Sequence, residues 1–198
     1  MPRPPRIQYP GAWHHVMNRG VDRQAVFRDR RDRPHFLVLL EEAVARFGVE
    51  LHAYCLMGNH YHLLVRTPEP NLDLAIHHLA GLYARAFNRR HGRDGPLFRS
   101  RYRSMLVESE RYLAAVTRYI HRNPVELGVD DLVAYEWSSL GAYVGSRPCP
   151  PWLTTTRVLS TVGEPSAYER LVTSAPRSSV EKVYDRQRWP LVLGDKHD

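Results

Sequence analysis

The sequence predicts an α+β protein with a ferredoxin-like βαββαβ sandwich, in which two helices cover one face of an antiparallel sheet. The main observation is the order of the signals: strand, helix, hairpin, helix, strand. A further amphipathic helix then remains to cover the open sheet face. The chain has 198 residues, 43% hydrophobic and 25% charged, which suits one packed core. We expect this core in residues 1–128 and a helical extension in residues 129–198.

The first strand and the first helix are read from residue type and spacing. Residues 13–19 form a β-compatible run that ends at Gly20. In residues 33–47 the apolar positions recur at the helical period. Pro34 near the beginning and Gly48 just past the end are typical helix boundaries.

A hairpin and a second helix follow. Residues 50–57 and 60–66 are two strand-like runs separated by Gly58 and Asn59, and the second run alternates between apolar and polar positions. Residues 71–90 repeat the helical period, with Asn71 as a plausible N-cap. This pattern predicts a second amphipathic helix.

The last core strand and the last core helix lie beyond a basic loop at residues 93–103. The apolar residues 105–107 predict the strand. Ser109 is a suitable cap for a helix that runs to about Arg122, because Pro124 disfavours continuation. In the extension we expect only a short helix near residues 137–143, a proline-rich break, and a helical stretch near residues 168–172.

Charge and cysteine content indicate the kind of partner and the cellular compartment. There are 28 Lys and Arg against 21 Asp and Glu, a net charge of +7, and most of the positive charge is arginine. Arginine suits bidentate recognition of phosphate, so a nucleic acid is the favoured partner. Cys55 and Cys149 are far apart, which fits a reducing cytoplasm and indicates no disulfide framework. No apolar run is long enough to span a membrane, so we expect no membrane partner.

Two histidines provide the first candidate for chemistry. His60 and His62 are two residues apart on the alternating strand, so both imidazoles lie on one sheet face while Tyr61 lies on the other. Such a pair can chelate one divalent cation if an oxygen ligand comes from elsewhere. Two solvated histidines on an exposed strand are the alternative interpretation.

The last core helix can supply the missing groups. Tyr119 and Asn123 are one turn apart, within about 40° of each other around the helix axis. Delivered to the histidine face, they would place a nucleophile beside a metal ligand. The alternatives are a tyrosine in the core and an asparagine chosen because Pro124 follows. Tyr112 lies two turns earlier on nearly the same face and is a rival nucleophile.

Several motifs resemble the REP-associated tyrosine transposases, a family of single-tyrosine HUH transposases. Residues 52–65, HAYCLMGNHYHLLV, resemble the HUH motif, and residues 118–125, RYIHRNPV, resemble the tyrosine motif. WHHVMNRG, FNRRHG and LFRSRY also match in the right order, so the resemblance covers roughly residues 5–145. The family usually has proline where this chain has Gly58, from which we expect a more flexible hairpin with its ligands intact.

The resemblance implies a metal-dependent endonuclease and strand transferase acting on single-stranded DNA at hairpins or palindromes. Tyr119 would attack a phosphodiester to form a 5′-phosphotyrosine link, and a 3′-hydroxyl would later reverse the attack. His60, His62 and Asn123 would bind Mg²⁺ or Mn²⁺, which suit an amide oxygen ligand better than zinc does.

DNA contacts are expected from the basic loop and the first strand. Arginines would hold phosphates and aromatic rings would stack on bases, and the candidates are Arg19, Arg99, Arg101, Arg103, Phe98 and Tyr102. A solvated arginine-rich loop is the alternative reading of these residues.

Two other functions stay open at this point. One is a non-catalytic nucleic-acid-binding module, because ferredoxin-like sheets with basic surfaces often bind RNA. The other is a different HUH enzyme, such as a replication initiator or a relaxase. The short connection at Glu108 and Ser109 favours a monomer that acts in cis, while a swapped homodimer stays open.

Overall fold

A five-stranded sheet in the order β2-β3-β1-β4-β5 forms the centre of the protein, whose computed structural model describes residues 7–174, 182–183 and 190–194. The first four strands pair antiparallel in the ferredoxin-like order, and the fifth pairs parallel to β4. The strands are β1 (Ala12–Arg19), β2 (Glu50–Leu56), β3 (His60–Thr67), β4 (Arg103–Val107) and β5 (Val192–Leu193). The predicted fold class is therefore confirmed.

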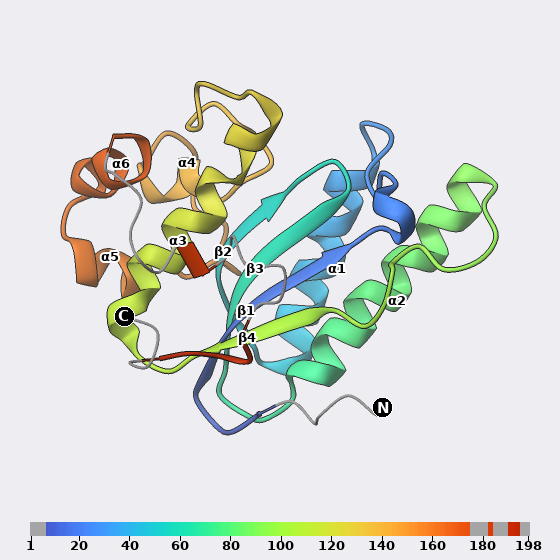
Figure 1. Cartoon of the computed structure of the whole chain (residues 1–198), viewed down its shortest axis with the longest axis horizontal. Helices are drawn as coiled ribbons and strands as arrows, with labels where there is room; N and C mark the ends of the chain where they lie inside the picture. The colour runs from blue at the N-terminus through green and yellow to red at the C-terminus, as the bar shows by residue number, and fades with distance from the viewer. Residues whose placement is uncertain (1–6, 175–181, 184–189, 195–198) are drawn as a thin grey trace.

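Two long helices, α1 (Asp32–Phe47) and α2 (Leu72–His91), cover one face of the sheet (Figure 1). They bury Phe36 and Leu79 against Leu63 and other apolar residues of the strands. Both helices begin and end within about one residue of the predicted bounds. Neither these helices nor any other in the described residues is long and apolar enough to cross a lipid bilayer.

The opposite face is covered by α3 (Leu113–Arg122) and by the short helices of the extension (Figure 1). As expected, Ser109 accepts a hydrogen bond from the Arg111 backbone N–H, at a short 3₁₀ helix, Glu110–Tyr112, before α3. A second 3₁₀ helix, Asn123–Leu127, follows α3. The extension contains α4 (Leu140–Tyr143), α5 (Thr156–Val162) and α6 (Pro165–Thr173).

The extension and α3 share one buried cluster. Val116 and Ile120 of α3 belong to it together with Leu140, Tyr168 and Val172 of the extension. We propose that the two segments, residues 1–128 and 129–198, fold as one cooperative unit, since α3 packs both on β2 and on α5 and α6 of the extension. The sequence did not indicate α5 or β5, because both are short and β5 exists only through pairing with β4.

The turn between β2 and β3 is tied to the loop after β1. The carbonyl of Gly58 accepts hydrogen bonds from the N–H groups of Val26 and Phe27, at 3.0 and 3.2 Å. Gly20 N–H donates to the carbonyl of Asn59 at 2.9 Å. These bonds anchor the histidine strand at its first residue, even without proline at position 58.

Alanine should have opposite effects at the two glycines of this region. A Cβ at Gly58 would meet nothing within 4 Å, and Gly58 does not have positive φ. Gly58→Ala should raise the free energy of unfolding by about 0.4–1 kcal/mol through lower unfolded-state entropy. A Cβ at Gly20 would lie 2.3 Å from the Gln24 carbonyl oxygen. Gly20→Ala should therefore lower the free energy of unfolding by about 1–3 kcal/mol. Urea unfolding measures both, and equal effects would contradict the prediction.

Candidate functional site

His60 and His62 lie on the sheet face that α3 covers. Their ring centroids are 5.0 Å apart, and they are only 5% and 2% exposed. Leu64, the next residue on the same face, packs in the α3 cluster, while Tyr61 packs against α1 and α2. The two histidines therefore share one face, as the alternation predicts, and the interpretation as solvated histidines is wrong.

Tyr119 on α3 and Asn123, the first residue after α3, lie near these histidines. The Tyr119 ring meets the His62 ring edge-on at 5.7 Å between centroids. The side chain of Asn123 lies close enough to His60 to act on that imidazole, whose pKa it raises against the larger effect of burial. Asn123 Nδ2 also donates to the Tyr119 carbonyl oxygen at 2.8 Å, which leaves the amide Oδ1 as the atom for the site. By contrast, the rival Tyr112 is buried in the α3 cluster, where its hydroxyl accepts from Arg111.

Each histidine has its Nδ1 occupied by a neighbour. His60 Nδ1 lies 2.6 Å from Asn59 Oδ1, and His62 Nδ1 lies 2.9 Å from His15 Nε2. With Nδ1 in these contacts, Nε2 is the atom of each ring through which a metal ion would be bound. Such outer contacts orient metal-binding imidazoles in known sites. Sequence reasoning placed His15 on the first strand but assigned it no role, because its contact with His62 depends on the β1–β3 register.

The site histidines are neutral at pH 7. Burial, followed by the nearby positive charge of Arg19, lowers the pKa of His60 to about 4. Burial, followed by the neighbouring His60, His15 and Arg19, holds the pKa of His62 well below its usual value. Neutral imidazole is the form that binds metal ions.

These donors fit a divalent cation. Two neutral imidazoles of β3 and the amide of Asn123, at the end of α3, lie near one another on this sheet face. Such a set suits an ion that keeps open positions, as Mn²⁺ and Mg²⁺ do.

A second group, Asp29, Asp32 and His91, also has donor atoms close enough for a metal ion. Asp32, however, already accepts backbone hydrogen bonds from Arg28 and Asp29 and contacts His91 and Arg90. These bonds fasten the beginning of α1 to the end of α2. We therefore assign this group to the fold and not to chemistry.

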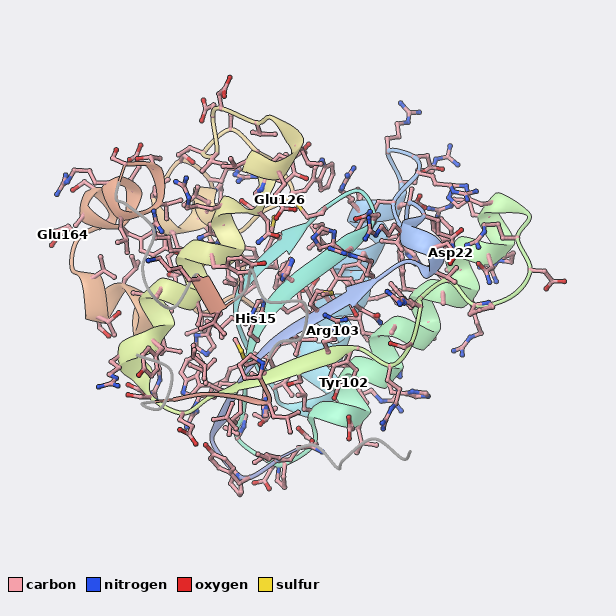
Figure 2. The ribbon with its side chains drawn as sticks, viewed as in Figure 1. His15, Asp22, Tyr102, Arg103, Glu126 and Glu164 are labelled. Atoms are coloured by element: carbon pink, nitrogen blue, oxygen red, sulfur yellow. The ribbon has the colours of Figure 1, made fainter. Side chains whose placement is uncertain are left out.

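Among the predicted DNA contacts, Arg19 and Arg103 lie on the histidine face. Arg19 pairs with His60 across β1 and β3, and its Nε has no hydrogen-bond partner in the described part of the chain. Arg103 begins β4 opposite Met17, one pair away from His15, and Figure 2 shows Arg103 beside His15 over the sheet. Arg99 and Arg101 are exposed in the preceding loop.

The two aromatic candidates lie elsewhere. Phe98 packs against the α1–α2 core, with its ring 5.9 Å from that of Tyr61. Tyr102 is only 7% exposed in the same core, and its hydroxyl donates to Asp73 on α2. The prediction that these rings stack on bases is corrected, because both are used for packing on the face opposite the histidines.

The fold and the site together define a class: a ferredoxin-like sheet that presents an HxH pair, an amide and a tyrosine on one face. Within that class, the family described as IS200-like transposase matches residues 8–123. The chain therefore belongs to the IS200-like transposase family, which gives it a transposase-like role in DNA processing and confirms the resemblance seen in its motifs.

One solved structure supports the fold. The chain is similar to a REP-associated tyrosine transposase bound to a REP hairpin, with a TM-score of 0.61 and 16% identity over 76% of this chain and 89% of that chain. It is also similar to a putative transposase from Deinococcus radiodurans R1, with a TM-score of 0.42 and 23% identity over 61% of this chain and 95% of that one. No curated protein matches the sequence.

Proposed function

We propose that the protein is a metal-dependent endonuclease and strand transferase for single-stranded DNA that acts through a 5′-phosphotyrosine intermediate. The observation that carries this proposal is the meeting of Tyr119 with His62 and of Asn123 with His60. A potential nucleophile and a ligand set, separated by some 60 residues of sequence, share one buried face. A DNA-binding module without chemistry has no need of this arrangement.

In the proposed reaction, Tyr119 Oη forms a bond to phosphorus and the bond from phosphorus to the 3′-oxygen breaks. The phenol loses its proton, and the departing oxygen takes up a proton to become a 3′-hydroxyl. Arg19 is positioned to hold the oxygens of the reacting phosphate. A divalent ion held by His60, His62 and Asn123 would supply Lewis-acid polarisation of that phosphate. Attack by another 3′-hydroxyl reverses the steps and joins strands.

We propose a DNA hairpin as the substrate and Mn²⁺ or Mg²⁺ as the ion. The similar REP-associated transposase is bound to a REP hairpin, and this chain carries an arginine-rich end suited to DNA phosphates. That end is built where the loop after β1 and the loop before β4 meet, since Val21 N–H donates to the Leu97 carbonyl and Arg99 N–H to the Arg19 carbonyl. Its exposed arginines are Arg23, Arg28, Arg30, Arg31, Arg89, Arg90, Arg99 and Arg101.

We also propose that the protein acts in cis as a monomer in a reducing, cytoplasmic setting. Tyr119 contacts His62 of its own chain, across the short connection between β4 and α3. A swapped homodimer is the alternative, and size measurement during catalysis separates the two.

The experiment that tests the function is a cleavage assay with end-labelled hairpin DNA that carries single-stranded flanks. We expect a protein–DNA adduct on a denaturing gel with Mn²⁺ or Mg²⁺, and no adduct when the metal is chelated. Tight binding without any adduct, across a panel of hairpins, would favour the non-catalytic module. Nicking of only one origin-like or transfer-origin sequence would favour a replication initiator or a relaxase.

Replacing the loop residues Arg99 and Arg101 should mainly affect DNA binding, whereas replacing Arg19 should mainly affect the reaction. The double change Arg99→Ala/Arg101→Ala should weaken binding of all hairpins similarly and reduce the slope of log K against log salt by about 2, since each phosphate contact contributes about 1. Arg19→Ala should instead reduce the adduct-forming rate more than binding. Fluorescence anisotropy at several salt concentrations and single-turnover rates measure both. An unchanged salt slope in the double variant would remove these two residues from the DNA surface.

A further inference from the structure

His15 occupies a place in the site for which the proposed reaction states no role. It lies on β1 beside β3, is fully buried, and faces α3 together with His62. Its Nε2 lies 2.9 Å from His62 Nδ1, and its ring meets the Tyr119 ring edge-on at 5.7 Å between centroids. One side chain therefore touches both a proposed metal ligand and the proposed nucleophile.

A close contact between two imidazole nitrogens requires one to donate a proton and the other to accept it. If His15 Nε2 donates, His62 accepts at Nδ1 and, as a neutral ring, carries its own proton on Nε2. That nitrogen then cannot bind a metal ion. If His62 Nδ1 donates, its Nε2 keeps a lone pair for the site. The direction of this one hydrogen bond therefore decides whether His62 can be a ligand.

Binding of a metal ion through Nε2 of His62 requires the second arrangement. A neutral imidazole with its proton on Nδ1 is the one that offers a lone pair at Nε2, and His15 Nε2 must then accept that proton. His60 is oriented in the same way, because its Nδ1 lies beside the amide oxygen of Asn59, which can only accept a hydrogen bond.

We propose that His15 is a positioning residue that accepts the Nδ1 proton of His62, keeps Nε2 of His62 available to a metal ion, and supports the ring of Tyr119. This proposal rests on the proposed metal-binding function. It adds that the ligand pair is oriented from two sources: Asn59 within the hairpin for His60, and His15 from the central strand for His62.

The proton position can be read directly in the metal-free wild-type protein. Multiple-bond ¹H–¹⁵N spectra of histidine distinguish a proton on Nδ1 from a proton on Nε2. We expect His62 to carry its proton on Nδ1, and His15 to be unprotonated at Nε2. A His62 ring protonated on Nε2 would overturn the proposal without any variant being made.

Two replacements of His15 separate positioning from packing. In His15→Leu the acceptor is lost, and in His15→Gln the amide oxygen stands near the place of Nε2. Mn²⁺ affinity without DNA, followed by the EPR signal of the free ion, should fall about 10–100-fold in His15→Leu and recover largely in His15→Gln. His52→Leu, a buried histidine packed on Trp13, is the matched control for volume and should keep wild-type affinity.

The outcomes are distinguishable from failure of the proposed function. Wild-type Mn²⁺ affinity in a folded His15→Leu protein would overturn the role of His15, whether or not the wild type cleaves DNA. Equal weakening in His15→Leu and His15→Gln, with an unchanged His62 proton position, would reduce His15 to a packing residue. If His15→Leu fails to fold, the wild-type spectrum and His15→Gln still decide the question. Absence of any adduct in the wild type would instead count against the reaction itself.

Discussion

Replacing Tyr119 with phenylalanine should abolish the covalent protein–DNA adduct and reduce strand cleavage by a factor on the order of 10⁴ or more. The change removes only the hydroxyl oxygen that would attack phosphorus. The ring itself, with its edge-on contacts to His15 and His62, stays in place. Hairpin binding and the melting temperature should therefore change little.

Tyr112→Phe is the matched control for this experiment. Tyr112 lies two turns earlier, is buried in the α3 cluster, and bonds to Arg111 through its hydroxyl. We expect the adduct to persist in this variant, with a loss of about 1 kcal/mol in stability from the missing hydrogen bond. Denaturing gels with single-turnover kinetics measure the adduct. An adduct that survives in Tyr119→Phe and disappears in Tyr112→Phe would show that Tyr112 is the nucleophile and would contradict this prediction.

Mild acid should unfold the protein, with a midpoint near pH 5. Five histidines are buried in a neutral form, because burial lowers each pKa: His15 and His121 to about 3, His52 and His60 to about 4, and His62 well below its usual value. In the unfolded chain each titrates near 6.5. Above pH 6.5 these histidines are neutral in both the folded and the unfolded state, so their contribution to the free energy of unfolding is fully present.

Below about pH 6.5 the unfolded state gains protons that the folded state does not accept, so stability falls. Each histidine contributes a slope of about 1.4 kcal/mol per pH unit until its folded pKa is reached. Together, five such slopes remove up to about 14 kcal/mol within two pH units, which is comparable to a typical stability of about 5–15 kcal/mol. Circular dichroism during an acid titration, with proton uptake measured in parallel, checks this.

The histidine origin of the acid transition has an internal control. His52→Gln should reduce the number of protons taken up on unfolding by about one and no more, because this buried ring is neutral in the folded state and titrates only in the unfolded chain. Stability that increases between pH 6.5 and pH 5 would show that the buried histidines are not the groups that control it.

Much of the fold and the central pair of the site could be predicted because they depend on local periodicity. Alternation in β3 placed His60 and His62 on one face, and the spacing of one helical turn placed Tyr119 beside Asn123. Each of these relations is set within a single strand or helix. The order of the elements then sufficed to predict the sheet on which they meet.

Other features were decided by pairing between distant segments. The aromatic residues Phe98 and Tyr102 follow the motif of a basic loop, yet they pack against α1 and α2. The two-residue β5 has no pattern of its own and is held by β4. Local sequence does not indicate which face of the core a loop residue reaches, since this depends on where the rest of the chain leaves space.

The sequence by itself determined the ferredoxin-like order of elements, the histidine pair, and the tyrosine one turn from an asparagine, because strand and helix geometry repeat every two or 3.6 residues. Only the tertiary structure decided that α3 lies over the histidines, that burial keeps their rings neutral, and that His15 contacts both His62 and Tyr119. The physical reason is that strand register and helix packing bring together side chains about 47 and 57 residues apart along the chain, and no periodicity within one element specifies those contacts.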